Sequence, residues 1–317
     1  MIRTHLLLPD GQVRVAEGLA LALTPPDGAT VWVDIVASTE AELAQLPAEW
    51  RFHPLAIEDC IHEQRRSKYE RYPGHAFLVL HALDTATEAD LDTLAVRIFV
   101  RPGLVVSVHH TPLTSLDRVD RMVLREAERV GQGADRVIHA IVDAIVDEFM
   151  HLLDGWEQQL DTLEHQVAVQ RDLRVTDQFI QLRRNLLVLR RIMLPQQEVV
   201  KRLMDSPETT DIGRIYYRDV LDHMDAIADT AALHVEVCAG SLQVQAERAN
   251  ERLNKVMKYF GVVSTLLLPM TVISGIFGMN FDVIPSAHAA YGFWTAIGMM
   301  LSSALVLLWW FRRRRWI

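Results

Sequence analysis

The side chains of this sequence that could do chemistry are oxygen donors, and they fall in two groups. Asn280 directly follows Gly278 and Met279 where an uncharged stretch ends. Further upstream, four carboxylates are spaced three, three and four residues apart: Asp219, Asp222, Asp225 and Asp229. Amide, carbonyl and carboxylate oxygens are the ligands of hard divalent cations, and Mg2+ keeps much of its water shell when it binds. The residues alone leave two interpretations open: contact with a divalent cation for both groups, or a Gly-Asn helix end for the first and a solvated acidic face for the second.

Enzyme motifs are absent from the sequence. It contains no Walker loop, GxSxG elbow, HExxH pair or dinucleotide fingerprint. Cys60 and Cys238 form neither a CxxC nor a zinc-ribbon spacing, so we expect reduced thiols. We predict a protein that is not an enzyme and has no organic cofactor.

The charge of the chain favours cations over nucleic acid as partners. The sequence carries 32 Lys and Arg against 41 Asp and Glu. The only charged residues after Lys258 are Asp282 and Arg312–Arg315. Residues 1–258 therefore hold 28 basic and 40 acidic side chains. Phosphate binding needs a basic surface, so nucleic acid is not an expected partner.

Two stretches near the C-terminus are long and apolar enough to cross a lipid bilayer. Tyr259–Met279 and Tyr291–Phe311 contain no charged residue. At about 1.5 Å per residue, each spans a hydrocarbon layer of roughly 30 Å. Aromatic residues followed by Arg312–Arg315 mark a cytoplasmic boundary, whereas residues 280–290 contain no Lys or Arg. We expect a multi-pass protein of the inner (plasma) membrane with both termini in the cytoplasm.

One helical face of the first span differs from the others. Small, polar or flexible residues recur there three and four apart: Asn254, Met257, Gly261, Ser264, Leu268, Thr271, Gly275 and Gly278. Such a stripe suits either a water-filled path or a close helix–helix seam. Pro269 frees a backbone carbonyl, which is tolerated beside neighbouring helices or such a path.

The rest of the chain divides into a mixed part and a helical part. Four short apolar runs bounded by turn signals predict strands: Val31–Val36, Ala76–Leu83, Leu94–Val100 and Leu104–His109. Helical patterns lie between them at Thr39–Leu46 and Pro54–Ile61, which predicts a mixed sheet covered by helices. Later residues predict long helices: Leu116–Val130, Asp135–Gln170, Thr176–Met204 and Ile212–Met279. The last would be roughly 100 Å long, so we expect it to need copies of itself as neighbours.

These motifs resemble the CorA family of divalent-cation transporters. Gly278-Met279-Asn280 stands at the outer end of the first of two C-terminal spans, as the family's hallmark tripeptide does. His53-Pro54-Leu55-Ala56-Ile57-Glu58-Asp59 and Arg65-Arg66-Ser67-Lys68-Tyr69-Glu70 resemble its soluble-domain signature. The resemblance implies an α+β membrane protein with an α/β/α soluble domain, a long helical stalk and two transmembrane helices per subunit of a homopentamer. The expected divisions are residues 1–115, 116–258 and 259–317.

The resemblance also implies roles for individual residues. Gly278, Met279 and Asn280 would form the selectivity filter, where amide and carbonyl oxygens contact a hydrated cation. The expected pore-lining residues are Asn254, Met257, Phe260, Gly261, Ser264, Leu268 and Thr271. Phe260 stands where a smaller aliphatic residue is expected, so it either narrows the gate or turns aside and leaves Gly261 facing the path.

A regulatory metal site is expected on the long helix. Asp219 matches the family's regulatory carboxylate, with Asp84 or Glu88 of a neighbouring subunit as its partner and Asp222 close by. Bound Mg2+ would hold the subunits together, and its loss would let repulsion open the pore. The alternative is a solvated acidic face. We also expect a solvated acidic face for four carboxylates that could attract cations towards the pore mouth: Asp143, Asp147, Asp154 and Asp161.

Magnesium is the expected ion, transported and regulatory, with cobalt or nickel as surrogates. Zinc transport is the alternative, because the loop after the tripeptide lacks the glutamate frequent in magnesium members and contains His288. A membrane-anchored sensor without transport is a second alternative. The polar stripe argues against it, because an anchor has no need of Asn254, Ser264, Thr271 and Asn280.

Overall fold

The computed structural model forms two compact units, Met1–Ser241 and Leu242–Ile317, and each is described by itself. The residues that the structure describes are 1–36, 43, 46–61, 66–85, 90–125, 133–169, 173–279 and 291–316. The predicted helix Thr39–Leu46 lies mostly outside them. The predicted division into residues 1–115, 116–258 and 259–317 remains a prediction.

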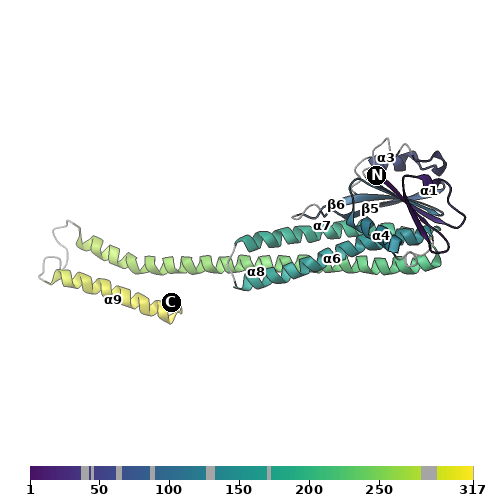
Figure 1. Ribbon diagram of the computed structural model, residues 1–317. Coiled ribbons are helices and arrows are strands. Elements are labelled where there is room, and N and C mark those ends of the chain that lie inside the picture. Colours follow the sequence, from purple (N-terminus) through teal and green to yellow (C-terminus); the bar gives the residue numbers. More distant parts are fainter. Residues whose placement is uncertain are drawn as a thin grey trace. The chain divides into compact units, whose positions relative to one another are not determined.

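The first unit is built on a seven-stranded mixed sheet (Figure 1). Its strands, in spatial order, are β2 (Val13–Glu17), β1 (Ile2–Leu7), β3 (Thr30–Val36), β7 (Leu104–His109), β6 (Thr93–Arg101), β5 (His75–Leu83) and β4 (Lys68–Tyr72). The β3–β7 pair is parallel and the other pairs are antiparallel. Four of these strands, β3, β5, β6 and β7, were predicted from their apolar runs, and the mixed sheet is confirmed.

Two tight turns set the register of the β4–β5 pair and of the β6–β7 pair. The β4–β5 hairpin turns at Pro73-Gly74 and the β6–β7 hairpin at Pro102-Gly103. Gly74 and Gly103 have φ of 87° and 73°, a backbone conformation that suits glycine. Proline followed by such a glycine is the residue order of a type II turn. In the neighbouring β5–β6 pair, Phe77 lies opposite Phe99.

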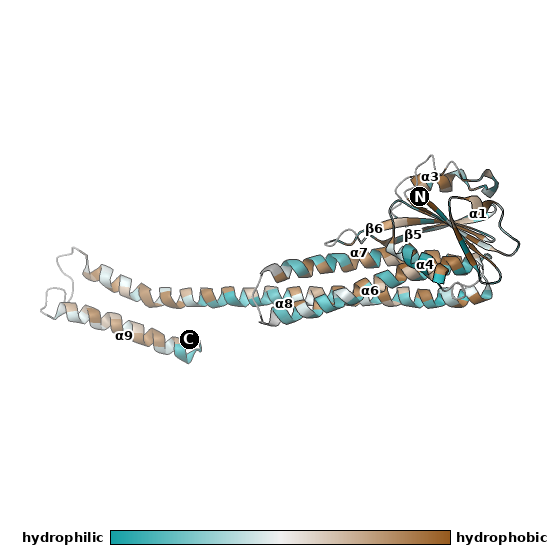
Figure 2. Ribbon diagram, in the orientation of Figure 1, coloured by the Kyte–Doolittle hydropathy of each residue, from teal (hydrophilic) through white to brown (hydrophobic). Residues whose placement is uncertain are grey.

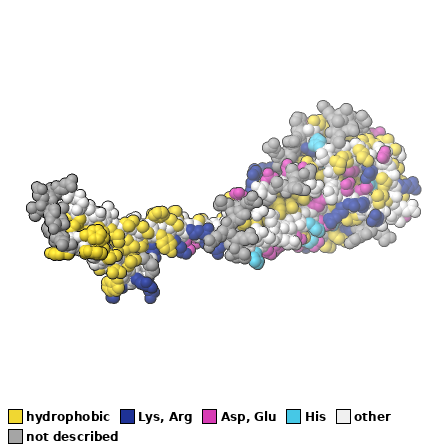
Figure 3. All heavy atoms as spheres, turned by 60° about the vertical axis from the view of Figure 1, so that its left-hand side comes forward, with side chains coloured by type: hydrophobic (Ala, Val, Ile, Leu, Met, Phe, Trp, Pro, Cys, Tyr) yellow, Lys and Arg dark blue, Asp and Glu magenta, His cyan; other side chains and the backbone are white. Residues whose placement is uncertain are grey.

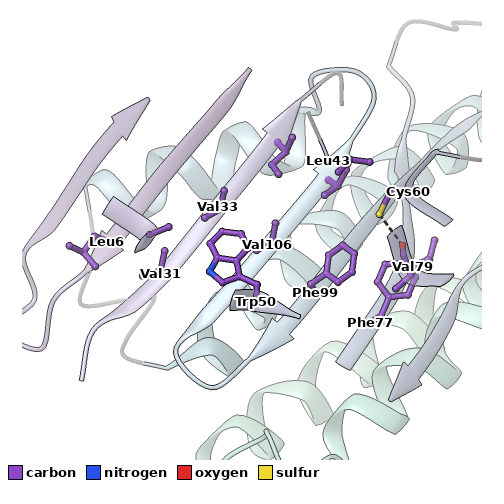
Figure 4. Packing of buried hydrophobic residues seen from close by; sticks show 14 residues of the cluster. Leu6, Val31, Val33, Leu43, Trp50, Cys60, Phe77, Val79, Phe99 and Val106 are labelled. Carbon is purple, nitrogen blue, oxygen red and sulfur yellow. Dashed lines mark hydrogen bonds between the residues drawn. The ribbon is translucent and has the colours of Figure 1, made fainter. Parts of the chain in front are cut away.

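Helices cover both faces of the sheet, and the apolar core lies on each side of it. On one face lie α1 (Ala20–Leu23), the short 3-10 helix η1 (Ala48–Trp50) and α3 (Pro54–Ile61), around Val33, Trp50, Cys60, Phe77 and Phe99 (Figure 4). Alternation along the strands places Trp32, Leu78 and Ile98, all fully buried, on the opposite face. That face packs on helices α6 and α7. The predicted α/β/α arrangement is confirmed.

The helices after the sheet match the predicted ones closely. They are α4 (Thr114–Arg125), α6 (Ala134–Val169), α7 (Leu173–Met204), α8 (Asp211–Phe277) and α9 (Gly292–Arg313). The start of α8 is defined by Thr210, whose Oγ1 accepts a hydrogen bond from the Gly213 amide at 3.0 Å, as an N-cap does. Asp135 of α6 accepts hydrogen bonds from the Thr210 amide and hydroxyl at 3.1 and 2.6 Å. The beginnings of α6 and α8 are therefore bonded to each other.

Candidate ion pathway and metal site

The two apolar helices of the second unit expose most of their side chains. In the apolar window of α8 6% of the residues are buried, and in that of α9 17%. The core helix of a soluble protein would bury most of such a window. Figure 2 shows the hydrophobic residues in brown on both helices. Length and composition suit both for crossing a membrane, where lipid or further protein would cover these side chains.

One face of α8 is covered within the unit. Val262 is buried, and the half-buried positions Leu266, Pro269, Ile273 and Phe277 follow it at steps of three or four. At about 100° per residue these five positions form a single stripe. Helix α9 runs back alongside this part of α8 (Figure 1), and Lys258 Nζ donates a hydrogen bond to the Arg315 carbonyl at 3.4 Å. The covered stripe is therefore the side of α8 that faces α9.

The predicted pore-lining residues lie on the other side of α8. Met257, Phe260 and Leu268 are 63%, 69% and 66% exposed. All seven positions are exposed: Asn254, Met257, Phe260, Gly261, Ser264, Leu268 and Thr271. Counting about 100° per residue from Val262, they centre roughly half a turn from the covered stripe. Phe260 and Gly261 are both open, so which of them faces a path remains a prediction, as does the role of the others.

Two threonine hydroxyl groups of this stretch bond to carbonyls of their own helix. Thr271 Oγ1 donates to the Leu267 carbonyl at 3.0 Å, and Thr265 Oγ1 donates to the Gly261 carbonyl at 2.8 Å. A hydroxyl whose proton is used in this way still offers lone pairs. Thr271 therefore presents an oxygen acceptor on the open face of α8, suited to a water molecule or a hydrated cation.

Helix α8 ends two residues before the predicted end. Its last helical residue is Phe277. The Gly278 amide donates to the Ser274 carbonyl at 2.9 Å and the Met279 amide to the Ile276 carbonyl at 3.3 Å. Gly278 does not adopt the left-handed conformation of a glycine cap, and an added Cβ would lie 3.1 Å from the Ser274 carbonyl oxygen. Asn280 and His288 lie outside the described residues, so the filter itself remains a prediction.

The predicted regulatory carboxylates are found at scattered positions of the first unit. Asp219 and Asp222 are exposed on α8, whereas Asp84 follows β5 and its amide donates to the Asp92 carbonyl at 3.0 Å. Glu88 lies outside the described residues. Among those described, no three His, Cys, Asp or Glu side chains of the single chain are grouped to hold a metal ion. The regulatory site, which was expected to use a neighbouring subunit, therefore remains a prediction.

Asp219 does have charged neighbours on α6, which the sequence did not indicate. Burial raises the pKa of Asp143, and the negative charges of Asp147 and Asp219 raise it further, while His223 acts in the opposite direction. Asp143 is therefore a half-buried acid at the α6–α8 contact. Asp147 pairs with Arg118 of α4 at 3.1 Å. The expectation that Asp143 and Asp147 form a plain solvated face is corrected for these two residues.

His139 completes this junction between α6 and α8. Burial lowers the pKa of His139 to about 4, together with the charge of Arg136, against the opposing effects of Asp219 and Asp135. Its ring makes edge contacts with Tyr216 and Tyr217, with centroids 5.1 and 5.9 Å away. At neutral pH His139 therefore adds no positive charge beside Asp219.

The soluble-domain signature has a structural explanation in this fold. Asp59 accepts a hydrogen bond from Lys68 Nζ, and the buried Arg97 donates from Nε to the Asp59 carbonyl at 2.8 Å. His53 stacks on Tyr72 with ring centroids 4.4 Å apart. These contacts fasten α3 to strands β4 and β6.

Comparison with known proteins gives concordant matches over most of the chain. The family described as CorA-like Mg2+ transporter protein matches residues 27–313. YfjQ of Bacillus subtilis, described as a metal ion transporter, is 29% identical over 293 residues, which are 92% of this chain and 91% of the relative. The cobalt/magnesium transport protein CorA of Thermotoga maritima is 27% identical over 296 residues, 90% of this chain and 83% of the relative.

A zinc transporter and a solved structure also match. The zinc transport protein ZntB of Pectobacterium atrosepticum is 23% identical over 286 residues, 85% of this chain and 84% of the relative. The complete structure of the CorA magnesium transporter of Methanocaldococcus jannaschii superposes with a TM-score of 0.87 at 20% identity, covering 100% of this chain and 99% of that one. This likeness covers the sheet, the long helices and the C-terminal helices together.

Proposed function

Because the chain belongs to the CorA-like Mg2+ transporter family, a family of divalent-cation transporters and not of enzymes, we propose that it carries Mg2+ into the cell through a homopentameric pore. The chain is a divalent-metal-cation transporter of the membrane with its transmembrane helices at the C-terminus. The identity of the ion, the pentamer and the roles of single residues are the proposal.

One observation carries the proposal: the open face of α8. That face bears Asn254, Ser264 and Thr271 and lies opposite the stripe that faces α9. In a bilayer, polar groups are costly against lipid, so they are expected to face water or other protein. Five copies of α8 around an axis would place this face toward the axis and α9 outside it. Met257 and Leu268 would then form apolar constrictions that gate by dewetting.

The proposed filter recognises the ion through its water. Mg2+ gives up its hydration shell reluctantly, so neutral oxygen atoms that accept hydrogen bonds from that shell suit it better than a cage of carboxylates. The Asn280 amide oxygens, with the carbonyls next to Gly278, would supply such a ring. No nucleotide hydrolysis is required, because the membrane potential drives a divalent cation inward.

Ion flux into liposomes that contain the purified full-length protein tests the pore. We expect Mg2+ uptake that is insensitive to a proton gradient and is reduced at least about tenfold by Asn280→Ala. Thr271→Ala should lower the flux as well. Thr295→Ala is its control on α9, because that half-buried threonine also donates to the carbonyl four residues back, at 3.0 Å. Unchanged flux in Asn280→Ala would refute the pore.

Zinc is the second candidate ion. ZntB, a zinc transport protein, is among the relatives, and the segment after Asn280 lacks the glutamate that is frequent in magnesium members and contains His288. Imidazole is a preferred ligand of zinc and a poor one for Mg2+. Zn2+ uptake that follows a proton gradient, with no Mg2+ uptake, would assign zinc. Absence of flux for either ion would favour a membrane-anchored sensor.

Regulation by intracellular metal is proposed at Asp219, with Asp84 or Glu88 of a neighbouring copy and Asp222. Millimolar Mg2+ should protect the oligomer from proteolysis, and Asp219→Ala should abolish this protection. Asp229→Ala is the control, because Asp229 is an exposed carboxylate on α8 more than two turns away from Asp219. Since Asp219 also acts on Asp143 within the chain, Asp143→Asn should be measured alongside. If Asp143→Asn and Asp219→Ala lose the protection from proteolysis equally, the loss would be explained by the α6–α8 contact and not by metal binding.

A further inference from the structure

The C-terminal end of α9 is closed by a hydrogen-bonded cap and is not frayed. The Trp316 amide donates to the Phe311 carbonyl at 2.9 Å and the Arg315 amide to the Arg312 carbonyl at 3.2 Å. These two bonds form a Schellman motif, which closes a helix with a left-handed residue. Arg315 holds that position with φ of 56°, where glycine is usual. Stacking of Trp316 on Phe311, centroids 5.8 Å apart, supplies the apolar contact that accompanies the motif.

The closed end presents its arginines outward. Phe311 is buried, whereas the four side chains of Arg312–Arg315 are exposed. The guanidinium of Arg313 lies 5.6 Å from the Trp309 ring and that of Arg314 lies 6.0 Å from the Trp310 ring. Both indoles are themselves largely exposed, at 62% and 45%. Planar cations thus lie beside flat aromatic faces at the end of an apolar helix.

Helix α8 adds further positive charge to this place. Lys258 Nζ bonds to the Arg315 carbonyl, and Lys255 lies one turn earlier on the side of α8 that faces α9. The nearest acidic residue along α8 is Glu251, and the only acid after it in the sequence is Asp282. Figure 3 shows the dark-blue Lys and Arg side chains at the border of the yellow surface of these helices.

We propose that Lys258, Arg312–Arg315 and the exposed Trp309 and Trp310 bind the headgroup of an anionic phospholipid. Several cations held together repel one another unless an anion lies among them, and guanidinium groups match phosphate oxygens in pairs. The indoles place the site at headgroup depth, where the acyl chains can lie on the apolar surface of α9. A free phosphate would use the cations and leave the indoles without a role. The proposal is independent of which ion is transported.

Retention of lipid by the delipidated full-length protein in neutral detergent tests the site. Native mass spectrometry would count phosphatidylglycerol and phosphatidylcholine molecules that remain bound per chain. We expect phosphatidylglycerol to be preferred, and Arg313→Gln with Arg314→Gln to weaken it roughly 25-fold, since each basic group near an anionic lipid is worth about a fivefold change in affinity. Raising the salt concentration should weaken retention as well.

Three controls keep the result interpretable. Arg183→Gln with Arg184→Gln removes the same charge from exposed positions of α7 and should leave retention unchanged. A variant with Arg312–Arg315 all changed to Lys keeps the charge and the membrane orientation, so it should keep most of the lipid retention. It replaces the double Gln variant if that variant fails to fold. Equal retention of the two lipids, or of wild type and the Gln variant, would refute the site. Competition by free glycerol phosphate at the affinity of the lipid would also refute it, because it would show a soluble phosphate site.

Discussion

At the scale of single residues, the contact between α4 and α6 contains an acid in an unfavourable environment. Burial raises the pKa of Glu148 to about 6, although the nearby Ser115 hydroxyl and the charge of Arg118 oppose the rise. Its Oε2 atom is buried and has no hydrogen-bond partner among the residues that the structure describes. Such a group is tolerated mainly in its neutral form.

The pH dependence of thermal stability should reveal this acid. Because the folded pKa lies above the unfolded value of 4.5, the stabilisation by neutral Glu148 is complete below pH 4.5 and is lost as pH rises through about 6. Glu148→Gln should therefore gain stability relative to wild type between pH 4.5 and 7.5. We expect about 1 kcal/mol, or roughly 2–4 °C in Tm, allowing for partial exposure to water. Unfolding of the detergent-solubilised protein at both pH values measures this. Glu157→Gln, at an exposed site of α6, is the control, and an equal gain at both pH values would contradict the prediction.

At the scale of elements, the long apolar or amphipathic segments were predictable and the polar strands were not. Helices α6 to α9 and strands β3, β5, β6 and β7 followed from periodicity, because their buried faces are apolar. Strand β1 was missed, since Arg3 and His5 interrupt its pattern. Both bond to Asp120 of α4, and a partner more than a hundred residues away leaves no local signal. Strand β4, Lys68–Tyr72, is charged and lies at the sheet edge.

The candidate pathway was predictable only in part for a related reason. The polar stripe of α8 follows from helical spacing alone. Its position opposite the covered stripe required α9, and the junction of Asp143 with Asp219 required the pairing of α6 with α8. Neither pairing is encoded in a local pattern, because each depends on which helices lie side by side.

Two glycines in different elements should respond to alanine in opposite ways. Gly103→Ala places a side chain at φ of 73° in the β6–β7 turn, which should cost about 1 kcal/mol of unfolding free energy. Gly155→Ala lies inside α6, and an added Cβ meets nothing within 4 Å. It should stabilise the protein by about 0.5–1 kcal/mol. Thermal unfolding of both variants checks this, and a stabilised Gly103→Ala would show that the turn does not require its glycine.

At the scale of the whole molecule, the native cysteines permit a clean test of orientation. Cys60 and Cys238 are both buried. Burial is the main cause that raises the pKa of Cys60 to about 12 and that of Cys238 to about 11. The thiolate is the reactive form, so both should label slowly.

New cysteines on the two sides of the membrane should then label differently. In intact cells a membrane-impermeant maleimide should react with Ser286→Cys, in the segment between the spans, and not with Asp10→Cys, an exposed position of the first unit. Permeabilised cells should label both, and the unmodified protein gives the background. Labelling of Asp10→Cys in intact cells would place the N-terminus outside and contradict the expected orientation.

The two-sided character of α8 has a practical consequence for engineering. The stripe through Val262, Leu266 and Ile273 packs within one chain, whereas the conduction chemistry is proposed on the opposite side. Substitutions that improve packing against α9 can therefore be selected for yield and heat tolerance without redesigning selectivity. Conversely, a library that varies only the open side can be screened for altered ion preference on an already robust scaffold.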